Sequence, residues 1–521
     1  MIKAILLGAL LGAATPVSAQ SARATLDTGM VEGIAARDGA DVDRYLGIPF
    51  AAPPVGPLRW REPQPLVRWR GVRAATAFGP RCMQLPLFAD MMFRSPPSSE
   101  DCLYLNIWTP PGAPARSGAT LPVLLYIYGG GFQTGDASEK RYDGAALAAR
   151  GAVVVTTNYR LNIFGFLAHP GLTAESPHHA SGNYGLLDQA AALAWVRRNI
   201  AAFGGDPNHI TIGGESAGSI SVSALMASPL TRDTLVGAIG ESGALMGSVT
   251  APPLKAAEQR GVAYAATASA PDVAALRAIS AAQLLESVGT ATPRFGPVID
   301  GHMLTEPVEA TFAAGRQAKV PLLVGTNSQE MGAEAVFDTA PPTADDYPAA
   351  LARLYGDRAD QVAALYPIAS DADAVPVATA LASDRFLSWP TWRWGELHRK
   401  TGAPTFIYQF RRVRPRAFVD APDAKRPWGA VHSAEIEYAL GNLDVNQRYA
   451  WTAEDRAAAA TMTGYWSNFV RTGDPNGAGL PAWPRADGTT PTRQVIDART
   501  TTEPFVEQAR YQAMDPLVER R

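Results

Sequence analysis

The sequence has few charged residues and almost no excess of either sign. Charged side chains make up 18% of the 521 residues, and 46 basic residues nearly balance 49 acidic ones, which leaves a net charge of −3. A protein that binds nucleic acid or an anionic membrane surface carries a basic patch or a basic excess. The composition therefore predicts no nucleic-acid partner.

Long apolar runs are missing after the N-terminus, and no later segment approaches the roughly 18 apolar residues that would span a bilayer. The N-terminus itself carries Lys3, an apolar stretch over residues 5–14 and the small residues Val17-Ser18-Ala19. This pattern is typical of a secretory signal peptide, and the stretch is too short for a membrane anchor. We expect residues 1–19 to be removed before Gln20, and the protein to be exported to the periplasm or the medium.

Cysteine is scarce, with Cys82 and Cys102 as the only two in the chain. Two cysteines without a histidine at ligand spacing do not make a metal site, so no metal is predicted. In an oxidising compartment the pair most simply forms one disulfide. Two buried free thiols are the alternative.

Hydrophobic residues make up 47% of the chain, which excludes a disordered protein. Short β-branched or aromatic runs alternate with Ala-rich helical stretches, which favours an α/β fold with a mostly parallel twisted sheet and helices on both faces. The predicted strands are Leu103–Trp108, Leu121–Tyr128, Ala152–Thr157, Ile210–Gly213, Val320–Gly325 and Thr405–Phe410. Residues 250–290 and 335–400 are helical and Ala-rich, and are expected to be insertions that cap the sheet. No repeat or linker divides residues 20–521, which are predicted to form one domain.

A glycine-flanked serine is the first candidate for chemistry. Gly214-Glu215-Ser216-Ala217-Gly218 follows the predicted strand Ile210–Gly213 and precedes a helical run over residues 219–227. Strand, sharp turn and helix are the context that a nucleophile elbow needs, because the strained turn leaves no room for side chains beside the serine. An ordinary glycine-rich turn is the alternative, since the five letters alone are weak evidence.

A second glycine run supports the catalytic interpretation. Gly129-Gly130-Gly131 closes the strand Leu121–Tyr128, where three glycines cost conformational entropy. Backbone N–H groups free of side chains can stabilise a developing oxyanion. We expect Gly130, Gly131 and Ala217 to form an oxyanion hole. A phosphate-binding loop is the alternative, but its Lys and Ser/Thr are missing.

The serine needs a base and an acid, which follow it in the order acid, histidine in this architecture. His432 lies in a loop after the strand Thr405–Phe410, and Glu330 is the first carboxylate after the strand Val320–Gly325. Glu334 and Asp338 are the alternatives for the acid. The remaining histidines precede the serine, precede the acid or lie on a helix: His169, His178, His179, His209, His302 and His398.

With these motifs, the chain resembles the type-B carboxylesterases, an α/β-hydrolase family that includes bacterial esterases and cholinesterases. The resemblance covers nearly all of residues 22–485. The matching stretches are Tyr45–Phe50, Pro53–Gly56, Leu58–Trp60, Ser99–Asn106, Asn158–Arg160, Gly182–Gln189, Phe203–Pro207, Gly473–Asn476 and Trp483–Pro484.

The resemblance implies an α/β-hydrolase fold and a serine carboxylesterase that needs no cofactor. Its Ser, Glu and His map onto Ser216, Glu330 and His432, and its disulfide onto Cys82 and Cys102. It also implies two structural ion pairs, Arg59 with Glu100 and Arg160 with Asp188. Gln329 stands where many members carry Asp, and we expect no consequence.

Substrate contacts are predicted at Glu215, Phe132 and Phe88. Phe88 belongs to the loop between the cysteines, together with Leu85, Leu87, Met91, Met92 and Phe93. The resemblance places this loop at the gorge entrance, although simple packing on the core is an equal alternative. The loop lacks the Trp with which cholinesterase-like members bind a quaternary ammonium, which argues against choline esters.

Other interpretations remain open from the sequence. The run Arg411, Arg412, Arg414 and Arg416 could contact an anionic substrate, but a solvated loop balanced by Asp420 and Asp423 is favoured. The same triad also serves lactone, amide or polyester hydrolases. A binding or adhesion role is disfavoured because serine, acid and histidine are all present. The predicted substrate is a small-molecule ester, and the oligomeric state is not predicted.

Overall fold

The structure, a computed structural model, describes residues 22–36, 41–113, 118, 120–289, 295–418 and 427–518. The predicted signal peptide, residues 1–19, and Gln20 lie outside the described residues, as do Asp420 and Asp423.

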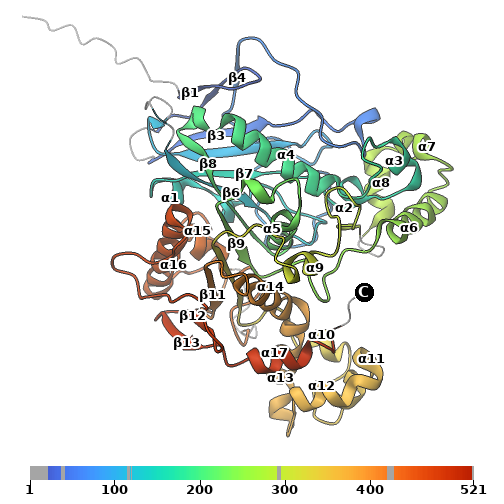
Figure 1. Cartoon of the computed structure of the whole chain (residues 1–521), viewed down its shortest axis with the longest axis vertical. Helices are drawn as coiled ribbons and strands as arrows, with labels where there is room; N and C mark the ends of the chain where they lie inside the picture. Colours follow the sequence, from blue (N-terminus) through green and yellow to red (C-terminus); the bar gives the residue numbers. More distant parts are fainter. Residues whose placement is uncertain are drawn as a thin grey trace, which may run out of the picture.

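Within the described residues, a ten-stranded mixed sheet runs through the molecule (Figure 1). From one edge to the other its strands are β13 (Thr501–Pro504), β12 (Thr492–Ile496), β11 (Thr405–Phe410), β10 (Leu322–Asn327), β9 (Gly237–Glu241), β8 (Gly205–Glu215), β6 (Leu121–Ile127), β7 (Val153–Thr157), β5 (Tyr104–Thr109) and β3 (Asp43–Pro49). Neighbours from β12 to β7 are parallel, whereas β13, β5 and β3 each pair antiparallel to a neighbour. A second, small sheet of β1 (Ala22–Thr25), β2 (Met30–Gly33) and β4 (Val72–Ala74) adjoins β3, because Ile34 and Thr76 form bridges with Arg44 and Leu46.

Helices cover both faces of the large sheet, which is why its central strands are apolar throughout. All five residues of β7 are buried, as are six of the seven residues of β6. Gly237 and Gly240 of β9 show the two layers, because positions three apart in a strand point to opposite faces. Gly237 faces α16 (Ala453–Thr472), while Gly240 faces α5 (Ala217–Ala227) and α14 (Trp389–Arg399). The predicted α/β class with helices on both sides is confirmed.

All six predicted strands are present, with Thr405–Phe410 matching β11 in both bounds. The predicted strand over residues 210–213 is the middle of the longer β8, whose pairing with β6 is irregular between Gly205 and Ile210. β9 was not predicted because its Gly-Ala-Ile-Gly-Glu sequence lacks a β-branched run. Its glycines are explained by packing: a side chain at Gly240 would collide with the Trp394 ring.

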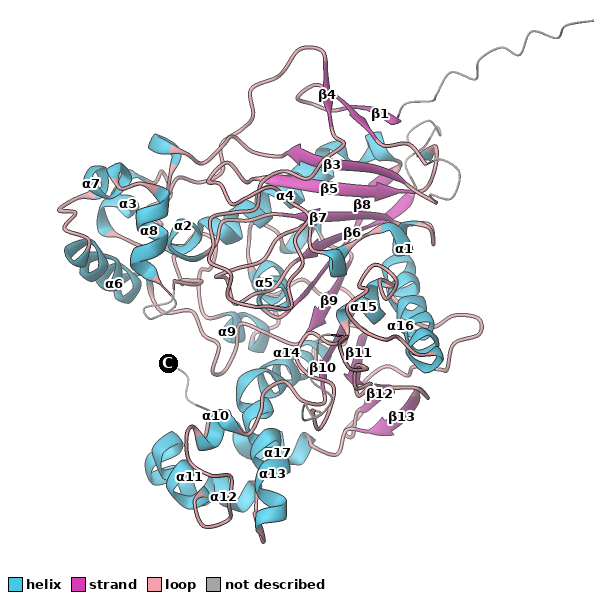
Figure 2. Cartoon of the chain, turned by 180° about the vertical axis from the view of Figure 1, so that it is seen from behind, coloured by secondary structure: helices cyan, strands magenta, loops and turns pink. Residues whose placement is uncertain are grey.

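The predicted helical insertions are present at one side of the sheet (Figure 2). The first contains α6 (Leu254–Thr267), α7 (Val273–Ala278) and α8 (Ala281–Val288). The second contains α10 (Glu334–Phe337), α11 (Tyr347–Tyr355), α12 (Ala359–Leu365) and α13 (Asp371–Ser383), and continues through η7 (Asp384–Ser388), a π-helical turn, into α14. No helix within the described ranges combines the length and the apolar character that crossing a membrane requires.

Candidate active site

Ser216 occupies a strained turn between β8 and α5. Its φ of 56° and ψ of −122° lie where residues with a side chain are rarely found. The flanking glycines are required by the end of β6: a Cβ at Gly214 would lie 2.6 Å from the Ile127 carbonyl oxygen, and one at Gly218 would overlap the same atom. The predicted strand, sharp turn and helix are therefore all present.

His432 and Glu330 reach Ser216 from two loops at the same end of the sheet. His432 Nε2 lies 2.9 Å from Ser216 Oγ, and His432 Nδ1 lies 2.7 Å from Glu330 Oε2. The loops follow β10 and β11, and their backbones meet in a parallel bridge between Gln329 and Val431. This bridge sets the next residue of each loop, Glu330 and His432, side by side.

The second oxygen of Glu330 is also occupied, which fixes the carboxylate. Oε1 accepts hydrogen bonds from the Asn327 N–H and the Ser242 hydroxyl, both at 2.6 Å. The Glu330 N–H in turn donates to Ser383 Oγ at 3.0 Å. Sequence reasoning did not find Ser242, although its position directly after a strand and before Gly243 could have indicated it.

The alternatives for the acid lie elsewhere. Glu334 begins α10 and Asp338 follows that helix. Among the described residues, the carboxylates within ion-pair distance of His432 are those of Glu330 and Glu215.

The glycine loop after β6 approaches Ser216 closely. A Cβ at Gly129 would lie 2.9 Å from Ser216 Cβ, and Gly130 and Gly131 have φ values of 111° and 65°. The N–H groups of Gly130, Gly131 and Ala217 donate to no acceptor within the described part of the chain. A serine bonded to a histidine and a buried carboxylate can perform nucleophilic acyl transfer. The three backbone N–H groups beside it can stabilise the oxyanion that forms.

Comparison with known proteins agrees with this chemistry. A sequence profile of the carboxylesterase family matches residues 20–514. The chain belongs to the carboxylesterase family. It is therefore a carboxylic ester hydrolase with the α/β-hydrolase fold, as its resemblance to type-B carboxylesterases predicted.

Individual relatives cover most of this carboxylesterase. It is 39% identical over 513 residues to a protein named fumonisin B1 esterase from Sphingopyxis macrogoltabida, covering 91% of this chain and 87% of the relative. It is 35% identical over 491 residues to the para-nitrobenzyl esterase of Bacillus subtilis, covering 91% and 95%. A solved PNB esterase structure superimposes with a TM-score of 0.80 at 33% identity, covering 95% of this chain and 99% of that one.

The carboxylesterase buries further acids beside the histidine. Glu215 Oε1 lies 3.2 Å from His432 Nε2, and Glu241 and Glu435 are also fully buried nearby. Burial by itself lowers the pKa of His432, but the charges of Glu215 and Glu330 outweigh it and raise that pKa to about 9. Burial raises the pKa of Glu215 to about 7 and that of Glu435 to about 8. Glu241 and Glu435 were not predicted from the sequence.

The predicted substrate contacts differ in their surroundings. Glu215 is buried beside His432, as just described. Phe132 is 6% exposed, with its ring against those of Phe166 and Tyr159. Phe88 is 49% exposed. The loop that carries Phe88 also holds Met91, whose Cε would lie 3.3 Å from a Cβ at Gly130.

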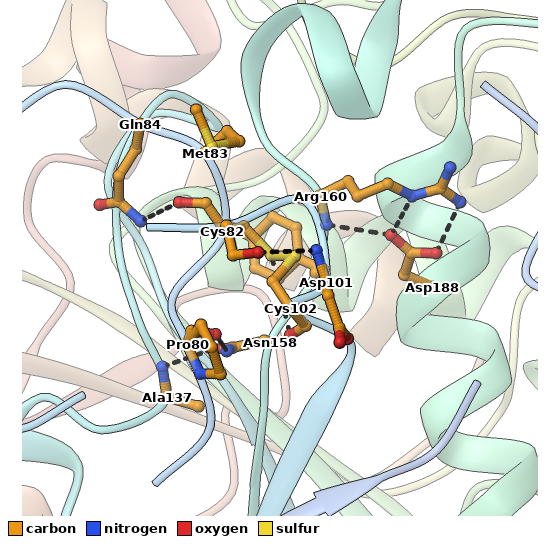
Figure 3. The surroundings of a disulfide bond; sticks show 12 residues. Pro80, Cys82, Met83, Gln84, Asp101, Cys102, Ala137, Asn158, Arg160 and Asp188 are labelled. Atoms are coloured by element: carbon orange, nitrogen blue, oxygen red, sulfur yellow. Dashed lines mark hydrogen bonds and ion pairs between the residues drawn. A yellow bond between two sulfur atoms is a disulfide. The ribbon is translucent and has the colours of Figure 1, made fainter. Parts of the chain in front are cut away.

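Cys82 and Cys102 form the predicted disulfide (Figure 3). Gln84 connects it to the glycine loop, because the Gln84 amide donates to the carbonyls of Cys82 and Gly135 at 2.9 and 2.8 Å. The Gln84 side-chain oxygen accepts from the Thr134 hydroxyl at 2.6 Å.

Both predicted ion pairs are also present. Arg59 binds both carboxylate oxygens of Glu100 at 2.6 Å, and Arg160 binds both oxygens of Asp188 at 2.8 Å. Figure 3 shows the second pair close to the disulfide.

The prediction of a solvated basic loop after β11 is wrong for the arginines whose partners are described. Arg411 binds Glu503, and Arg412 binds Asp455. The Arg414 side chain is 8% exposed, and it binds Glu437 at 2.5 Å and the carbonyl of Ser433, the residue after His432. These pairs join the loop to β13, to α16 and to the segment after His432, at sequence separations of 92, 43 and 23 residues.

One group outside the triad has the residue types of a metal site. Glu62, His178 and His302 place their ligand atoms within 4.8 Å of one another, the one such group among the described residues. The two imidazole rings stack face to face at 3.8 Å. Because a metal lies in the plane of each ligating ring, these histidines would have to turn before both could bind one ion.

Proposed function

We propose that this carboxylesterase hydrolyses small-molecule esters through an acyl-enzyme on Ser216. The observation that carries the proposal is the continuous chain of hydrogen bonds from Ser216 Oγ through both nitrogens of His432 to Glu330, at a strained turn. The N–H groups of Gly130, Gly131 and Ala217, which donate to no acceptor among the described residues, support it.

In this mechanism His432 Nε2 takes the Ser216 proton as Oγ attacks the ester carbonyl carbon. Glu330 orients the ring and stabilises the imidazolium. The N–H groups of Gly130, Gly131 and Ala217 donate to the oxyanion. The alcohol leaves with the proton from His432. Water then attacks the acyl-enzyme with His432 as its base, which releases the acid and restores the Ser216 hydroxyl.

A fluorophosphonate probe tests the nucleophile. The wild-type chain should gain one adduct, on the peptide that carries Ser216. Ser216→Ala should gain none and should lose hydrolysis of a short nitrophenyl ester by roughly three or more orders of magnitude. Ser242 is the rival labelling site to exclude, because its buried hydroxyl donates to Glu330. An adduct on Ser242, or full activity in Ser216→Ala, contradicts the proposal.

We also propose that the protein is exported after cleavage before Gln20, and that residues 20–521 act as one domain. The disulfide supports export, because such bonds persist in oxidising compartments. Intact-mass measurement of the protein from the periplasm or medium should give a chain that starts at Gln20. A chain that starts at Met1 and carries two free thiols contradicts it.

A further inference from the structure

A cavity of about 340 Å³ adjoins the candidate triad. Its walls are largely apolar and come from α10, α11, α12 and the C-terminal α17 (Gln508–Met514). Two lining residues connect it to the active site: Met331 follows Glu330, and the Phe386 ring meets the His432 ring edge-on at 6.1 Å. A group bound there lies beside Phe386, whose ring packs against the base of the reaction.

Arg385 supplies the charge in this wall. Its guanidinium carbon lies 5.7 Å from the centre of the Tyr355 ring. No carboxylate of the described chain lies within ion-pair distance of it, whereas nearby arginines are paired: Arg510 binds Asp384 and Arg393 binds Glu309. Among the described residues, Arg385 therefore presents a cation without a carboxylate partner to a largely apolar cavity.

Hydrogen bonds from neighbouring side chains hold the turn that carries Arg385 and Phe386 in place. Both lie in η7, the π-helical turn between α13 and α14, and such turns recur at functional sites. Asp384 anchors the start of the turn through Tyr366, Tyr511 and Arg510, at 2.7–2.8 Å. The Ser248 hydroxyl donates to the Arg385 carbonyl at 2.7 Å.

We propose that this cavity binds the part of an ester substrate that carries a free carboxylate, and that Arg385 binds that carboxylate. The proposal rests on the esterase function of Ser216. A guanidinium binds a carboxylate with two parallel hydrogen bonds, and apolar walls suit a methylene chain. The volume holds roughly ten non-hydrogen atoms, at about 30 Å³ each. The substrate class is an ester with a carboxylate several carbons from the scissile bond, such as a monoester of a dicarboxylic acid.

Paired substrates test this specificity. Ethyl hydrogen adipate and ethyl hexanoate have acid parts of similar length, but the first carries a carboxylate. The ratio of their kcat/KM values should favour the adipate in the wild type and fall about ten- to hundredfold in Arg385→Gln, mainly through KM. Arg385→Lys keeps the positive charge, so its ratio should lie between those of the wild type and of Arg385→Gln. The matched control is Arg260→Gln, an exposed charge on α6, which should leave the ratio unchanged.

Binding gives a second readout that does not depend on turnover of the charged ester. Adipate should inhibit hydrolysis of ethyl hexanoate more strongly than hexanoate does, and added salt should reduce the difference. A wild type that labels at Ser216 and hydrolyses ethyl hexanoate, yet shows no preference for the adipate, overturns this inference and leaves the proposed function standing. A ratio unchanged in Arg385→Gln also overturns it. Loss of labelling and of all ester hydrolysis in the wild type removes the proposed function as well.

Discussion

At the scale of the residue, two glutamates contact the same histidine with different consequences. Glu330 lies at Nδ1 and has its second oxygen held by Asn327 and Ser242. Glu215 lies at Nε2, on the side of the serine, and its Oε1 makes no hydrogen bond within the described residues. The first arrangement orients the ring, whereas the second mainly places a negative charge beside it.

Glu330→Gln should lower kcat by about three to four orders of magnitude with little effect on folding. The neutral amide has no charge to stabilise the imidazolium, and it no longer holds the neutral ring in the tautomer that carries its proton on Nδ1. Glu334→Gln is the control, since Glu334 begins α10 and lies beyond ion-pair distance of His432. Steady-state kinetics and thermal melts measure both effects. If Glu334→Gln were the more damaging change, the acid would be wrongly assigned.

Glu215→Gln should move the pH dependence of kcat/KM to lower pH. His432 can accept the Ser216 proton only when it is neutral, and its pKa is raised to about 9, so wild-type activity should rise with pH from neutral into the alkaline range. Removing the Glu215 charge removes a major cause that raises this pKa, so the rise should begin at lower pH. A rate profile measured from pH 6 to 10 provides the test, and superimposable profiles for the two proteins would refute it.

At the scale of the element, buried ion pairs join segments that are distant in the sequence. Arg160 follows β7, while Asp188 lies on α4 (Tyr184–Asn199), and both side chains are at most 4% exposed. Arg414, in the loop after β11, binds Glu437 on α15 (Ile436–Leu440), 23 residues further along, and so closes the connection that carries His432. These pairs set the positions of loops and helices around the sheet.

Arg160→Ala should lower the free energy of unfolding by about 3–5 kcal/mol, because it leaves the Asp188 carboxylate buried without its partner. Arg456→Ala should change it by less than about 1 kcal/mol, because its pair with Asp444 is 52% and 80% exposed. Denaturant unfolding compares the two variants. Equal stabilities would show that burial does not govern the contribution of these pairs.

At the scale of the whole molecule, the disulfide and the catalytic loops form one connected region. Cys82 meets the glycine loop through Gln84, and the loop between the cysteines is further held by Arg94 on Asp143 at 2.6 Å and by Met92 N–H on Glu139 at 2.8 Å. The disulfide therefore adds a covalent bond to hydrogen bonds and an ion pair that already hold the loop between the cysteines beside Gly130.

Cys102→Ser should lower the free energy of unfolding by about 3 kcal/mol on the chain-entropy account of a loop of this length. It should change KM more than it changes labelling of Ser216. The turn that holds Ser216 belongs to β8 and α5, whereas the loop between the cysteines is held in part by the disulfide. The double variant Cys82→Ser/Cys102→Ser controls for a lone reactive thiol. Loss of labelling in parallel with KM would instead indicate that the bond supports the elbow itself.

The sequence by itself determined the class of the protein, because local patterns carry that information. Apolar runs predicted the buried parallel strands, and glycines around Ser216 predicted the turn. Chain order selected Glu330 and His432, which the structure brings within hydrogen-bonding distance of each other. The two disulfide cysteines and both family ion pairs could also be named from the sequence.

Tertiary structure alone decided which distant side chains meet. The sequence of β9 has no strand pattern. It forms a strand because it pairs with β10 on one side and β8 on the other, and the Trp394 ring packs against Gly240. Ser242 comes to Glu330, and Arg414 to Glu437, only when separate segments pack together. Arg385 is one of many arginines in the sequence; it becomes distinctive because folding pairs its neighbours with carboxylates and leaves it facing an apolar cavity. Long-range packing and charge pairing leave no trace in local sequence periodicity, since the partners of each residue are set by the fold.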